Sequence, residues 1–65
     1  MIGEISLLKY RSSKPRKNYG IIRGKDGNEY WFPLLGYGDL ETGMIVSFEG
    51  ERDEKGLVAR EVKAV

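Results

Sequence analysis

The sequence contains no cysteine and no histidine, and these two absences exclude several kinds of protein chemistry. No disulfide can brace the fold, and the commonest ligands of a structural zinc ion are missing. The usual general base and the thiol nucleophile of enzymes are missing as well. We therefore expect no enzymatic activity, no metal and no cofactor.

Long apolar runs are also missing. No stretch approaches the roughly 18 residues that span a membrane, and the N-terminus lacks the basic-then-apolar layout of a signal peptide. Together with the lack of cysteine, this predicts a cytoplasmic protein without a membrane partner. The length of 65 residues predicts a single domain, residues 1–65, with a small core and little stability to spare.

The charge is unevenly distributed, although the net charge is only +1. Residues 1–25 carry seven basic side chains and one acid, a net charge of +6, whereas residues 26–65 carry four basic side chains and nine acids, a net charge of −5. This separation favours a polyanionic partner on one side of the molecule, and a solvated basic segment is the simpler alternative. The four acids within residues 49–54 are typical of a solvated charged hairpin, since a calcium loop needs a longer ligand pattern.

Nine glycines separate short runs that are rich in β-branched and aromatic residues. These runs predict strands at residues 2–8, 19–24, 28–34, 44–50 and 57–62. An open sheet of five strands would leave two unpaired edges, so a closed barrel of OB (oligonucleotide-binding) or SH3-like type is expected. Residues 36–43 include three glycines and are too few for a full helix. We therefore predict an all-β fold, a small five-stranded antiparallel OB-type barrel without a full helix.

Residues 19–33 predict a hairpin with its turn at 25–27. A two-residue Asp-Gly turn would set Ile22 opposite Trp31. A three-residue loop with Gly27 at positive φ gives another register, in which the opposed pairs are Tyr19 with Pro33, Ile21 with Trp31 and Arg23 with Glu29. We predict the second register, because it forms a cross-strand ion pair and keeps the inward face apolar.

In this register Tyr19, Ile21 and Trp31 share the outward face. An exposed apolar patch of this kind usually marks a contact surface. Aromatic rings beside cations such as Arg23 suit single-stranded nucleic acids, because bases stack on the rings while the cations follow the phosphates. The alternative is that Trp31 belongs to the core and its neighbours along the strand face outward.

The same motifs resemble those of cold-shock domains over nearly the whole chain. Residues 3–8 (Gly-Glu-Ile-Ser-Leu-Leu) are similar to the family's opening Gly-x-Val-Lys-Trp-Phe strand, and residues 17–22 (Lys-Asn-Tyr-Gly-Ile-Ile) to its Lys-Gly-Phe-Gly-Phe-Ile motif. The Asp-Gly turn at 26–27 and Tyr-Trp-Phe-Pro at 30–33 follow at the family spacing, and residues 37–48 resemble the stretch that leads into strand four. The resemblance implies a five-stranded OB barrel that binds single-stranded RNA or DNA by base stacking.

Some family positions differ in this chain. Leu7 replaces the exposed tryptophan of the first strand, Ile21 the second phenylalanine of strand two, and Pro33 the histidine of strand three. The stacking residues that carry over in kind are Tyr19, Trp31 and, less closely, Tyr37. Because aliphatic side chains also suit an apolar protein contact, a protein–protein interaction module on the same barrel is the alternative function.

The loop at residues 9–17 contains five cations, one aromatic ring and no acid. Its position directly before Tyr19 favours phosphate binding, and a solvated loop is the alternative. We thus predict a non-enzymatic single-stranded nucleic-acid-binding protein, a monomer or weak dimer. The predicted binding residues are Tyr19, Trp31, Ile21, Arg23, Pro33, Tyr37, Leu7, Tyr10, Lys9, Arg11, Lys14, Arg16 and Lys17.

Overall fold

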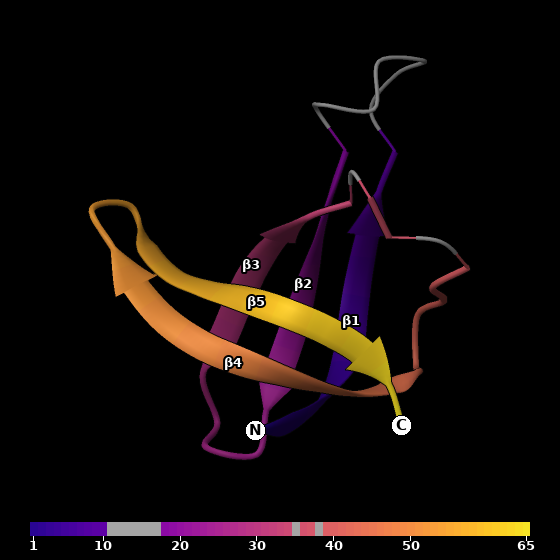
Figure 1. Ribbon diagram of the computed structural model, residues 1–65, viewed down its shortest axis with the longest axis horizontal. Helices are drawn as coiled ribbons and strands as arrows, with labels where there is room; N and C mark the ends of the chain where they lie inside the picture. Colours follow the sequence, from indigo (N-terminus) through magenta and orange to yellow (C-terminus); the bar gives the residue numbers. More distant parts are fainter. Residues whose placement is uncertain (11–17, 35, 38) are drawn as a thin grey trace.

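A computed structural model describes residues 1–10, 18–34, 36–37 and 39–65 (Figure 1). It contains five strands: β1 (Ile2–Lys9), β2 (Tyr19–Gly24), β3 (Glu29–Pro33), β4 (Ile45–Asp53) and β5 (Gly56–Ala64). The described residues form no helix, and hence none that is long and apolar enough to cross a membrane. The all-β prediction is confirmed, and β2 has the predicted bounds.

The five strands form one closed ring in the order β1-β2-β3-β5-β4, with β4 returning to β1. The β4–β5 hairpin crosses in front of the β1–β3 layer (Figure 1). Four neighbouring pairs are antiparallel, whereas β3 and β5 are parallel and meet at Trp31 and Val58. A ring with an odd number of strands cannot reverse direction at every step, so one pair must be parallel. The predicted closure is confirmed, and this seam is where the fold departs from a purely antiparallel barrel.

The β2–β3 hairpin has the predicted three-residue turn. The Gly27 amide donates to the Gly24 carbonyl at 3.0 Å, and the Gly24 amide donates to the Asn28 carbonyl at 2.9 Å. Gly27 has φ of 86°, which a residue without a Cβ adopts at little cost. The resulting pairs are the predicted ones: Tyr19 with Pro33, Gly20 with Phe32, Ile21 with Trp31, Ile22 with Tyr30 and Arg23 with Glu29.

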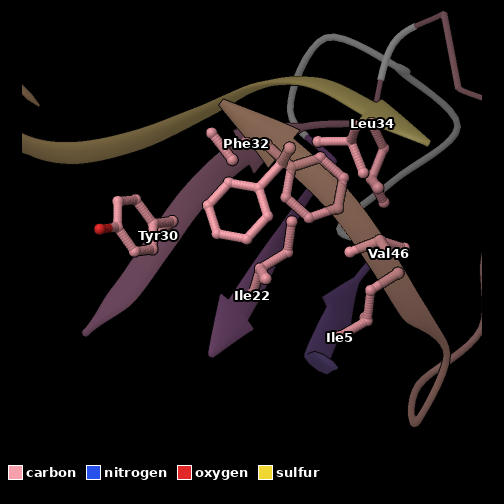
Figure 2. Packing of buried hydrophobic residues seen from close by; sticks show 9 residues of the cluster. Ile5, Ile22, Tyr30, Phe32, Leu34 and Val46 are labelled. Atoms are coloured by element: carbon pink, nitrogen blue, oxygen red, sulfur yellow. The ribbon is translucent and has the colours of Figure 1, made fainter. Parts of the chain in front are cut away.

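The core lies inside the ring and draws on every strand. Its completely buried members are Phe32, Ile5, Ile22 and Val46, which Figure 2 shows packed together. On β3, Phe32 is fully buried while Trp31 is 43% exposed. The predicted orientation of this strand, with Trp31 facing outward, is therefore confirmed. The aromatic residues of β3 therefore divide between the core and the outward face.

Tyr30 ties the core to the turn of the hairpin. Its ring is at one end of the cluster with the hydroxyl oxygen pointing away (Figure 2), and that hydroxyl donates to Asp26 Oδ2 at 2.5 Å. The Tyr30 hydroxyl and then the Asn28 amide lower the pKa of Asp26 below its usual 3.8. The same hydrogen bond is the main reason that the pKa of Tyr30 is raised above 10.0. A hydrogen bond between a core ring and a carboxylate thus holds the turn in place.

A bulge in β1 changes which side chains face outward. The register with β2 shifts between Ile5 and Leu7, so that Leu7 lies opposite Ile21. Ile5 is buried and Leu8 packs against the core, whereas Ser6 and Leu7 are both exposed. The Ser6 hydroxyl donates to the Ile21 carbonyl at 3.3 Å. Strict alternation would have turned Leu7 inward with Ile5, and the bulge instead adds it to the outward surface.

Candidate functional site

The outward surface of β1, β2 and β3 carries a row of apolar side chains. Leu7, Ile21 and Trp31 lie opposite one another across the three strands. Tyr19 and Pro33 form the next pair along β2 and β3. We call these five residues the aromatic face. The structure therefore brings together five of the predicted binding residues on one surface.

Tyr19 and Trp31 form a stacked pair within the aromatic face. Their ring centroids are 6.2 Å apart and their planes differ by 25°. They sit diagonally across the β2–β3 pair, a separation that aromatic side chains can bridge. Trp31 is 43% exposed and Tyr19 is half-buried, so part of the stacked pair is accessible from solvent.

One cation of β1 and one of β2 border this face. Lys9 is exposed and lies opposite Tyr19, at the end of β1. Arg23 forms the predicted pair with Glu29, but Arg23 Nη2 and Glu29 Oε2 are 3.8 Å apart and the two side chains are 66% and 60% exposed. An exposed pair of this length contributes little to stability, so Arg23 can turn to another anion at small cost.

The remaining predicted cations fall on the loop after β1. Arg11, Lys14, Arg16 and Lys17 lie outside the described residues, and their role stays a prediction. Tyr10 is described and is strongly exposed just after the end of β1. In the sequence it directly follows Lys9, which lies at the edge of the aromatic face.

Tyr37 is not brought to the aromatic face. Its ring packs edge-on against Phe32, at a centroid distance of 5.7 Å and an interplanar angle of 85°. Its hydroxyl accepts the amide proton of Val62 at 3.4 Å, where the register between β4 and β5 shifts next to Glu61. Glu61 has φ of 55°, the one positive value for a non-glycine in the part of the chain that the structure describes. Tyr37 thus helps to hold an irregular strand, and sequence reasoning had no signal for this contact.

Sequence reasoning also missed a hollow beside Trp31. It has a volume of about 660 Å³ and lies where the turn between β4 and β5 comes close to β3. The residues that line it are Trp31, Asp53, Glu54, Lys55, Leu57 and Val58. The hollow lies along the parallel β3–β5 seam, and no local sequence motif predicts that seam. A second hollow of about 400 Å³ lies outside β1 and β2, around Arg23 and Ile45.

The site offers stacking surfaces, hydrogen-bond acceptors and a few cations. Among residues 1–10, 18–34, 36–37 and 39–65, no three acidic side chains gather in a way that could hold a metal ion. No protein-family model matches the chain, and neither curated proteins nor solved structures give a significant match. The function therefore has to be inferred from the residues of the face.

Proposed function

We propose that this protein binds single-stranded RNA or DNA through the aromatic face, without catalysis, in the manner of the cold-shock domains that its sequence resembles. The observation that carries the proposal is the exposed Tyr19–Trp31 stack. Every base presents a π-face, so a pair of rings on an open sheet can accept bases with little regard to sequence. The basic segment of the chain supplies the charge that follows the phosphates.

The positions of these side chains in the fold also support the proposal. OB-type barrels of five strands bind oligonucleotides on the face of their second and third strands, between the loops after strands one and four. In this protein the two stacked rings come from β2 and β3. The predicted basic loop follows β1, and the hollow beside Trp31 lies at the turn after β4. The stacked rings and the hollow therefore lie on the parts of the fold with which this class of barrel binds, and this supports the proposal.

The aliphatic side chains of the aromatic face limit the affinity that stacking can provide. Leu7, Ile21 and Pro33 offer apolar contact but no ring on which a base can stack. Stacking contributes roughly 1–3 kcal/mol per base, so two rings account for only part of a useful affinity. We therefore infer that phosphate contacts carry a large share, and that binding is weakened strongly by salt.

A fluorescence titration tests the proposal, because Trp31 is the only tryptophan. A short oligo-pyrimidine strand should quench its emission at low salt, and the affinity should fall steeply towards physiological salt. Binding by Trp31→Ala is measured instead with a labelled oligonucleotide, and it should be clearly weaker than that of the wild type. Ile45→Ala, which truncates another exposed apolar side chain outside the aromatic face, should bind as the wild type does.

Two results would count against nucleic-acid binding. An unquenched Trp31 at low salt would refute the proposal directly. A quench that barely changes with salt would indicate an apolar contact of the kind proteins make, since screening acts mainly on charges.

A further inference from the structure

We propose that the hollow between Trp31 and the β4–β5 turn is a subsite for a single base, and that it selects guanine. This inference rests on the proposed function, because it assumes that a single strand lies on the aromatic face. It concerns residues that the resemblance to cold-shock domains does not single out. The hollow combines an apolar wall with a polar rim, and each restricts which base can bind.

The walls near β3 and β5 are apolar. Trp31 stands between Tyr19 on the β2 side and the hollow on the β5 side. Val58 lies opposite Trp31 across the parallel seam and is only 9% exposed, yet it does not belong to the core cluster inside the ring. Leu57 adds a second aliphatic side chain. A base stacked on Trp31 would therefore find apolar side chains beside it, as bases do in recognition pockets.

The rim of the hollow is polar and comes from the turn. Asp53 Oδ1 accepts the amide proton of Lys55 at 2.8 Å, which orients the Asp53 carboxylate. Within the described residues, Asp53 Oδ2 has no hydrogen-bond partner. Glu54 and Lys55 are exposed beside it. The rim thus combines two carboxylates, which only accept hydrogen bonds, with one ammonium group, which only donates them.

Guanine matches this rim better than the other bases. Its Watson–Crick edge presents two adjacent donors, the N1 proton and the 2-amino group, next to the O6 acceptor. One carboxylate can accept both donors while the Lys55 ammonium donates to O6, and such charge-assisted pairs are the strong ones. Uracil and thymine place carbonyl oxygens on both sides of a single donor, and those oxygens would face the carboxylates. Cytosine and adenine offer one amino donor beside an acceptor nitrogen.

The charge distribution explains how a polyanion can approach an acidic turn. Lys9 lies on the β1 edge of the aromatic face, opposite Tyr19, whereas the β4–β5 turn lies at the β3 edge, beside Trp31. The turn projects past β3 (Figure 1), and residues 49–56 carry four acids against two cations. Phosphates are therefore favoured near β1 and disfavoured near the turn, so the backbone runs on the basic side with a base directed towards the hollow. The acids then lower general affinity and raise selectivity.

The binding test uses three strands that differ at one position. The full-length protein is titrated with labelled octamers of uridine that carry uridine, guanosine or inosine at a central site, at one fixed salt concentration. A good bidentate contact discriminates by at least about fivefold, so the guanosine strand should bind about five times or more tightly than all-uridine. Inosine lacks the 2-amino group and should lose most of this gain.

Two variants test the carboxylates. Glu54→Gln and Asp53→Asn keep the side-chain shape, and the amide oxygen that the second change introduces can still accept the Lys55 amide proton. One or both should reduce the guanosine preference towards unity while all-uridine binds equally well or more tightly. Glu41→Gln removes the same charge from an exposed acid that does not line the hollow, and it should keep the preference.

The outcomes separate the subsite from the proposed function. Equal binding of the three strands by the wild type would overturn the subsite and leave the proposed function standing. A guanosine preference that survives in both variants would overturn the assignment to Asp53 and Glu54. Failure to bind any of the strands at low salt would overturn both the proposed function and the subsite.

Discussion

Tyr19 and Trp31 stack with centroids 6.2 Å apart although neither faces the other directly across the strands. Tyr19 is opposite Pro33, and Trp31 is opposite Ile21. The two rings therefore meet along the diagonal of the β2–β3 pair. Because the two rings are already in contact before a ligand arrives, a base that stacks on them needs little further ordering of side chains.

We expect Tyr19→Ala to weaken binding of a short single strand by about 5- to 150-fold, the loss that corresponds to one stacked base at roughly 1–3 kcal/mol. Tyr19→Phe keeps the ring and should retain most of the affinity. Anisotropy of a labelled oligonucleotide measures both variants. If the Phe variant binds as weakly as the Ala variant, the hydroxyl rather than the ring is responsible and stacking at this position is ruled out.

Lys9 should contribute to the salt dependence of binding. It lies opposite Tyr19 at the edge of the aromatic face, where a backbone phosphate would pass. Each phosphate contact adds roughly 0.7 to the slope of log affinity against log salt on single strands, so Lys9→Gln should reduce the slope by about that amount. Lys63→Gln removes an exposed cation on β5 and is the matched control. Equal slopes for the wild type and Lys9→Gln would exclude a phosphate contact at Lys9.

The hairpin could be predicted from the sequence because its determinants are local. The turn depends on Gly27, and a register shift of one residue would have buried Trp31 and exposed Phe32. The alternation of outward and inward aromatic residues along the hairpin indicates the register. The Arg23–Glu29 pair indicates the same register, so it could be predicted without any tertiary contact. The same reasoning identified Tyr19, Ile21 and Trp31 as one surface.

Long-range features could not be predicted in this way. The β1 bulge turns Leu7 outward, and it is a feature of the pairing of β1 with β2, which lies far along the chain. The hollow beside Trp31 depends on a parallel contact with Val58, which lies 27 residues further along the chain. Tyr37 resembled a stacking residue by its place in the motif, whereas its hydroxyl is engaged by Val62. In each case a contact between distant segments determines the role of the residue.

The hydrogen bond between Tyr30 and Asp26 should make stability depend on pH at both ends of the range. The folded pKa of Asp26 is lowered, mainly by Tyr30, so the unfolded chain binds the proton first as the pH falls. This contribution is complete above about pH 4 and is lost as the pH falls through the folded pKa. The folded pKa of Tyr30 is raised above 10.0 by Asp26, so its contribution is present below about pH 10 and is lost as the pH rises through the folded pKa.

Tyr30→Phe should therefore lower the urea midpoint at neutral pH. It should also make this midpoint fall less steeply as the pH is lowered. Urea denaturation across the acid range measures this. Tyr37→Phe is the matched control, because its hydroxyl accepts from a backbone amide rather than donating to a carboxylate. If the urea midpoint falls as steeply with decreasing pH in Tyr30→Phe as in Tyr37→Phe, the Asp26 contact does not contribute to the acid dependence of stability.

Gly20 should tolerate no larger side chain, because β2 passes close to a core ring. A Cβ at this position would lie 2.6 Å from Phe32 Cε1 and 2.7 Å from Cζ, and Phe32 is completely buried. Gly20→Ala is thus expected to lower the free energy of unfolding by about 1–3 kcal/mol, the usual cost of overpacking. Urea denaturation of the single variants and of Gly20→Ala/Phe32→Leu measures the coupling. The smaller leucine should relieve the clash, so the double variant should be less destabilised than the sum of its single changes; strict additivity would mean that the Phe32 ring is not what excludes a side chain at Gly20.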